Sequence, residues 1–267
     1  MNRIVVHESV RNTFHNSLYE GEQRLGRSWP SLFATGAVGG IDVGMGVLGL
    51  LLVTSATGSE IAGAVAFGAG FIALTLANSE LFTENFLVPI APIVARRARI
   101  LALLRLWTGT LLTNLLGGWI ITWVIIEALP QVRHTAIVIG SRYADAGLSL
   151  SSLASAILGG VVITLMTWME RGTESVTGKL VAAEISGFLL AAGHLNHAVV
   201  ASLEMFAALH AGATFGYGVW FGQFCWAVLG NVTGGVVFVT VLRLLQVGAE
   251  AITEERERAD RERPQDD

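Results

Sequence analysis

Six long stretches of this sequence carry almost no charge, and they constrain the fold more than any other feature. A helix needs about 20 mainly apolar residues to cross the hydrocarbon core of a bilayer, and each stretch is near or above that length. The chain is 52% hydrophobic and only 14% charged, whereas soluble proteins are about one quarter charged. The sequence therefore predicts an all-α membrane protein with six transmembrane helices, at 31–53, 61–78, 106–126, 148–169, 180–213 and 217–242.

Polar residues interrupt two of these stretches. The second is followed by residues 79–86 (SELFTENF), after which apolar sequence resumes, and the fifth contains residues 193–197 (GHLNH). Irregular backbone is tolerated at membrane depth only where protein covers it or where it lines a polar cavity. We therefore expect helices two and five to be broken, and the two breaks to face each other and form the functional site.

A short pattern recurs in the two halves of the chain. Asn114-x-x-Gly-Gly in span three returns as Asn231-x-x-Gly-Gly in span six, 117 positions later (231 − 114), and the Gly-Gly pairs at 39–40 and 159–160 are 120 apart (159 − 39). The offset of 117 also places Glu80 on His197. Because three spans per half is an odd number, the pattern predicts two inverted three-helix repeats, 29–129 and 148–246, as in many transporters.

The basic residues predict how the chain lies in the membrane. With six spans, 15 of the 17 Lys and Arg fall on the side of the termini and only Arg133 and Arg142 on the other. Basic residues favour the cytoplasmic side, so both termini of this multi-pass inner-membrane protein are expected there. Residues 1–28 are predicted to hold an amphipathic helix on the cytoplasmic membrane surface, 29–246 the membrane domain, and 247–267 a charged cytoplasmic tail, either a solvated helix or disordered.

The 79–86 motif, the two Asn-x-x-Gly-Gly patterns and the histidine of the second break together resemble the formate/nitrite transporter family. The resemblance covers nearly all of residues 7–246. It implies a homopentamer of aquaporin-like protomers, each with its own pore for a small monovalent anion such as formate or nitrite. It also implies that Leu81 and Phe82 form a constriction and that Thr83 hydrogen-bonds near the central histidine. Leu195-Asn196-His197 fits the family pattern for that histidine better than His194 does.

Two departures from the family pattern leave the substrate open. Glu84 stands where the family usually has a small residue, so its carboxylate would either repel anions or act as a proton partner. The lysine that commonly precedes span four is absent, and Arg142 is the nearest cation.

The chemistry expected of the site follows from the cost of moving an anion into a medium of low dielectric constant. A proton removes that cost, and histidine is the side chain best placed to lend one near neutral pH. We therefore predict passive or proton-linked transport of a small weak-acid anion with His197 as the proton relay. The alternative is an aquaporin-like channel for a small neutral solute, although paired Asn-Pro-Ala loops are absent.

The other polar residues of the breaks are expected to support the pore. Asn114 and Asn231 offer donors and acceptors to the backbone of the two loops, Glu80 is expected to bond loop amides, and Glu84 and Asn196 are expected near the pore. The pair His194-x-x-His197 falls short of the three ligands that catalytic zinc requires. We expect no cofactor, metal, enzymatic activity or nucleic-acid partner; the predicted partners are the anion, protons, the lipid bilayer and further copies of the chain.

Overall fold

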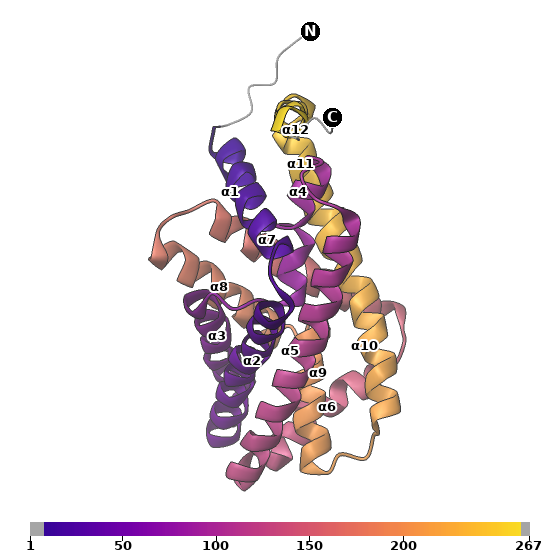
Figure 1. The fold of residues 1–267 in the computed structure, drawn as a ribbon. Coiled ribbons are helices and arrows are strands. Elements are labelled where there is room, and N and C mark those ends of the chain that lie inside the picture. The colour runs from indigo at the N-terminus through magenta and orange to yellow at the C-terminus, as the bar shows by residue number, and fades with distance from the viewer. Residues whose placement is uncertain (1–7, 263–267) are drawn as a thin grey trace.

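The computed structural model describes residues 8–262. The first and last residues of the predicted N-terminal segment and tail, 1–7 and 263–267, lie outside the described residues. Every regular element in the described part is helical. The helices are packed into an elongated bundle, with α1 and α12 at one end, which also carries both termini, and α6 toward the other (Figure 1).

Five helices in the described part are long and apolar enough to cross a membrane. A sixth is missing from this set because the fifth predicted span is divided between α8 (Val176–Ala192) and α9 (Ala198–Ala211), which are both too short to qualify alone. The five are α2 (Trp29–Thr57), α3 (Glu60–Ala77), α5 (Ile100–Ala128), α7 (Leu150–Arg171) and the continuous helix Tyr217–Val247, which comprises α10 (Tyr217–Val232), η3 (Thr233–Val241) and α11 (Leu242–Val247).

The α-helices α3 and α8 end at the two predicted breaks. Asn78 ends α3 in the left-handed conformation (φ 52°), and the chain then forms the short helices η1 (Phe82–Phe86) and α4 (Ile90–Val94). His194 also has a positive φ of 46° after α8, and His197 caps the start of α9. A residue in the left-handed conformation cannot continue a right-handed α-helix, so each break begins abruptly at one residue.

Paired glycines bring the long helices into backbone contact. A methyl group on Gly40 of α2 would lie 2.1 Å from the backbone oxygen of Asn114 in α5, and one on Gly160 of α7 would lie 2.2 Å from that of Asn231 in α10. Small residues permit such close helix approach in membranes, where packing drives association. Each asparagine therefore lies at a close contact between two helix backbones.

The helices α1, α6 and α12 lie outside the six predicted spans. In α1 (Glu8–Leu25), Phe14 and Leu18 are buried in a cluster with residues of α4, α11 and α12, so its apolar face contacts protein. A short helix that the sequence analysis did not predict, α6 (Arg133–Ala146), follows the turn η2 (Pro130–Val132) and packs along α9. The predicted tail begins as a helix, α12 (Ala249–Glu262), in which Glu254 pairs with Arg11 at 2.7 Å.

The segment η3 departs from the α-helical hydrogen-bond pattern and forms a π-helix. Such segments place side chains where an α-helix would not, and they are frequent at functional sites. Here Thr240 donates a 2.6 Å hydrogen bond to the backbone oxygen of Phe86, at the end of the first break.

Candidate functional site

The two breaks meet at one hydrogen bond. Oγ1 of Thr83 lies 2.7 Å from Nε2 of His197, and both side chains are fully buried. The other ring nitrogen of His197, Nδ1, accepts a hydrogen bond from the backbone N–H of Val200 at the start of α9. A neutral imidazole carries its proton on the nitrogen that is not accepting, so Nε2–H faces Thr83 and donates to its hydroxyl.

Leu81 and Phe82 are buried beside this pair, with 0% and 2% of their surface exposed. The Phe82 ring packs edge-on against Phe86 (4.9 Å between centroids) and Trp107 (6.1 Å). The Trp107 indole N–H donates to the backbone oxygen of Asn85 at 2.9 Å. Aromatic packing and this hydrogen bond therefore hold the apolar part of the break in a single position.

Each break is held by one asparagine, and the two use the same contacts. Asn114 accepts from the N–H of Phe82 (2.9 Å) and donates to the oxygens of Glu80 (2.8 Å) and Gly36 (2.7 Å). Asn231 likewise accepts from the N–H of Ala198 at 2.8 Å. It donates to the backbone oxygens of Asn196 at 3.0 Å and Ala156 at 2.7 Å. The amides thus satisfy one N–H and one carbonyl in each break, and they join the breaks to α2 and α7 through the carbonyls of Gly36 and Ala156.

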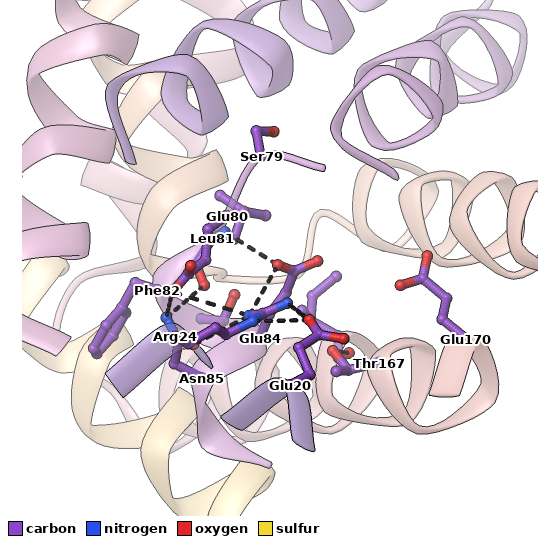
Figure 2. A network of polar contacts seen from close by, with 12 residues as sticks. Glu20, Arg24, Ser79, Glu80, Leu81, Phe82, Glu84, Asn85, Thr167 and Glu170 are labelled. Atoms are coloured by element: carbon purple, nitrogen blue, oxygen red, sulfur yellow. Dashed lines mark hydrogen bonds and ion pairs between the residues drawn. The ribbon is translucent and has the colours of Figure 1, made fainter. Parts of the chain in front are cut away.

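A buried arginine from α1 enters the first break (Figure 2). Arg24, 5% exposed, donates to Oδ1 of Asn85 at 3.1 Å and lies 3.7 Å from the carboxylate of Glu84. Its Nε and Nη2 atoms also donate hydrogen bonds to Oε1 of Glu20, on the same helix, at 2.9 and 2.5 Å. Burial lowers the pKa of the Arg24 guanidinium, and Glu84 opposes that shift. The network joins α1 to the break.

The two glutamates of the break have different contacts from those expected. The backbone N–H of Leu81 donates to the carboxylate of Glu84 at 3.2 Å, so Glu84 also helps to hold the loop, a role that was expected of Glu80 alone. Glu80 instead accepts from the side-chain amide of Asn85 at 2.6 Å and pairs with Arg27. Arg24 of α1 and Arg27, which follows that helix, both lie on this side of the break, and the sequence pattern alone did not reveal this.

Two cavities flank the buried Thr83–His197 pair. The near cavity, at the end of the bundle that carries the termini, has a volume of about 430 Å³ and is lined by Arg24, Ser79, Glu84 and Glu170, among others. The far cavity has a volume of about 290 Å³, and Asn196 is in its wall. Glu84, next to Thr83 in sequence, lines the near cavity, and Asn196, next to His197, lines the far cavity, so the pair lies close to both cavities.

His194 lies away from the central pair, at the mouth of the far cavity. It is hydrogen-bonded to Arg142 of α6, and its Nε2 lies 3.1 Å from Glu60 of α3. Arg142 is itself bound by both carboxylate oxygens of Glu60. These hydrogen bonds raise the pKa of the Arg142 guanidinium above its ordinary value, so it stays charged at every physiological pH.

The structure thus brings His197, Thr83, Leu81, Phe82 and the two asparagines into one buried region and leaves His194 outside it. Sequence analysis did not identify Arg24, Arg27 or Asn85 as parts of this region. The signal for the arginines was available only as two cations on an amphipathic segment, which is also what a helix on the membrane surface would show.

Comparison with known proteins decides the family. Residues 11–245 match the family described as "Formate/nitrite transporter". The chain belongs to the formate/nitrite transporter family. Membership makes it a membrane transport protein rather than an enzyme.

Individual relatives agree with this family. The chain is 26% identical to "Inner membrane protein YfdC" of Escherichia coli, over 91% of this chain and 78% of the relative. Its fold is similar to that of a solved "FNT family ion channel", with a TM-score of 0.73, 18% identity and coverage of 90% and 97% of the two chains. It is also similar to a "Pentameric formate channel with formate bound", with a TM-score of 0.67, 19% identity and coverage of 81% and 96%.

Proposed function

We propose that this member of the formate/nitrite transporter family carries a small monovalent weak-acid anion across the inner membrane, together with a proton. The observation that supports this most is the buried Thr83–His197 hydrogen bond between two cavities. A bare anion would lose its hydration there at a cost of several kilocalories per mole. Protonation removes that cost, and an imidazole next to a hydroxyl is a chemically suitable donor.

In this proposal each residue of the breaks has a separate role. The neutral His197 ring first takes up a proton from solution, and the imidazolium so formed gives its Nε2 proton to the anion, which returns the ring to the neutral state. Thr83 orients the ring. Leu81 and Phe82 form the apolar constriction that admits the neutral acid and rejects hydrated ions. Asn114 and Asn231 hold the loops that carry these side chains, and they do so with matching sets of three hydrogen bonds.

We also propose that the halves 29–129 and 148–246 are inverted repeats and that the chain forms a homopentamer with cytoplasmic termini. The paired contacts of Asn114 and Asn231, and of Gly40 and Gly160, support the repeat. A solved relative in fold is described as a pentameric formate channel. The distribution of Lys and Arg, 15 of 17 on the side of the termini, supports the orientation.

A panel of small anions tests the function. Purified protein in liposomes would be given formate, nitrite, acetate, lactate or hydrosulfide at two pH values, with wild type and His197→Asn side by side. We expect uptake of at least one anion to increase at the lower pH in the wild type, and this increase to be lost in the variant. Water permeability without any anion or proton flux would instead favour the neutral-solute channel.

A further inference from the structure

The far cavity contains polar groups that the proposed transport path does not use. It lies between the end of α6, the start of α7, the second break and α10, and its wall includes Arg142, Ser152, Ser155, His194, Asn196 and Gln223. The cavity of about 290 Å³ is large enough for a small acid. Its chemistry depends on which of these groups already have partners.

Two side-chain amides in this wall have an oxygen without a partner. The side-chain oxygens of Asn196 and Gln223 are buried and accept no hydrogen bond from any described residue. Both residues are only 3% exposed. A buried polar atom without a partner is unfavourable, and a ligand in the cavity could supply the hydrogen-bond donor that these two oxygens lack.

The serines beside them are already engaged. Ser155 Oγ accepts from the backbone N–H of Asn196 at 3.0 Å. Ser152 Oγ donates to the backbone oxygen of Gly147 at 2.8 Å and accepts from the Trp226 indole N–H at 3.1 Å. The amides are therefore the polar groups of the wall that most need a ligand.

The positive charge of Arg142, at the mouth of the far cavity, is compensated by the carboxylate of Glu60. Both carboxylate oxygens of Glu60 bind Arg142, and His194 contacts the same two residues. Tyr143 of α6 also lines the cavity, and the carboxyl of Glu204 of α9 is buried. No positive charge on the described elements around the cavity is therefore free of a carboxylate to bind an anion.

Amide chemistry distinguishes the two forms of a weak acid. A primary amide offers one acceptor oxygen and two N–H donors, whereas a carboxylate offers only acceptors. A protonated carboxylic acid has both an O–H donor and a carbonyl acceptor, so it pairs with an amide through two hydrogen bonds. A carboxylate facing the Asn196 and Gln223 oxygens would have no hydrogen to give them.

We propose that the far cavity is a binding subsite for the neutral, protonated form of a small carboxylic acid, held by the side-chain amides of Gln223 and Asn196. This inference rests on the proposed function for the identity of the acid. It adds that the far side binds the acid in the form that carries the proton, which is the form in which the acid passes the apolar constriction.

Calorimetric titration of the detergent-solubilised full chain with formate and with formamide tests the subsite. Formamide is a neutral analogue with a donor and an acceptor, and it does not change protonation between pH 5 and pH 6. We expect the dissociation constant for total formate to rise about tenfold from pH 5 to pH 6, because the neutral fraction falls about tenfold per pH unit. The constant for formamide is expected to stay the same.

Two variants test whether formate and formamide bind in the far cavity. Gln223→Met keeps the side-chain length but removes the amide, and it is expected to weaken both ligands roughly three- to tenfold, as the loss of one hydrogen bond predicts. Gln246→Met is the matched control, because Gln246 is on α11, away from the far cavity, and accepts a hydrogen bond from Arg243. It is expected to bind as the wild type does.

Other results would overturn the proposal. Formate binding that is equal at the two pH values, or the absence of formamide binding, would show that the cavity takes the anion or nothing. Unchanged binding in Gln223→Met would place the ligand elsewhere. The proposed transport function fails separately, if ligands bind as expected but no anion is taken up by liposomes.

Discussion

At the scale of single residues, Asn114 and Asn231 hold the two breaks by the same means. Each side chain makes three hydrogen bonds to backbone groups, and both residues are fully buried. Backbone groups that lose such a partner cannot turn to water at this depth. The amides are therefore expected to be needed for folding as much as for transport.

Replacing either asparagine by alanine tests whether these amides are needed for folding. Asn114→Ala and Asn231→Ala each remove the side-chain partner of one N–H and one carbonyl of a break, at about 1–3 kcal/mol for each group. We expect both variants to lose many degrees of thermal stability in detergent, by similar amounts. Asn16→Ala is the control, because Asn16 makes one hydrogen bond at an exposed position. A variant of Asn114 or Asn231 as stable as Asn16→Ala would contradict this role.

Arg24 gives a second prediction at this scale. Removing one partner of a buried ion pair typically costs 3–5 kcal/mol, so Arg24→Met is expected to destabilise the protein by about that amount. Arg11→Met, on the same helix, removes an exposed pair with Glu254 and is expected to cost about 1 kcal/mol or less. Thermal unfolding of the two variants in detergent compares them directly.

A double variant shows whether the charge of Arg24 is the reason for the stability lost in Arg24→Met. Glu84→Gln in the Arg24→Met background removes a carboxylate that the first change leaves without its cation, so part of the lost stability should return. If the double variant is less stable than Arg24→Met, the guanidinium acts by packing rather than by charge.

At the scale of helices, the glycine contacts set how closely the long spans pack. An added methyl at Gly40 or Gly160 meets a backbone oxygen that cannot move without shifting a whole helix. Gly40→Ala and Gly160→Ala are therefore expected to lower the yield of folded protein sharply, as measured by size-exclusion chromatography. Gly218→Ala, where nothing lies within 4 Å, should be neutral or slightly stabilising. A normal yield for Gly40→Ala would refute this packing.

The sequence predicted some helices and missed others for a physical reason. Apolar length and interruption are local properties, so the spans and the two breaks could be found from the residues themselves. The positions of α1, α6 and α12 depend on contacts between distant segments. Arg24 illustrates the limit, because its burial against Glu84 arises from the docking of α1 on the break, which no local pattern encodes.

The candidate site was predictable to a similar extent. The recurring Asn-x-x-Gly-Gly pattern pointed to both loop-holding amides, and the histidine in the second break pointed to the central contact. It was not predictable that Glu84, rather than Glu80, would accept a hydrogen bond from the backbone N–H of the loop. Glu80 and Glu84 are four residues apart in one motif, and only the positions of Arg24 and Arg27 distinguish them.

At the scale of the whole molecule, many large apolar side chains of the spans are exposed, among them Leu112, Leu116, Phe221, Val237 and Phe238. Lipid or further copies of the chain would cover them. If the chain is a homopentamer, native mass spectrometry from a mild detergent should give five times the chain mass of 28.4 kDa. A monomer as the largest stable species would contradict that assembly.

The central claim is that a proton crosses with the anion by way of His197. Its most direct test is the internal pH of liposomes, followed with an entrapped pH-sensitive dye while formate is added outside. Wild-type protein should acidify the lumen faster than empty liposomes do, because formic acid is delivered and dissociates, and His197→Asn should remove that difference. Acidification that is equally fast in wild type and His197→Asn would contradict the account.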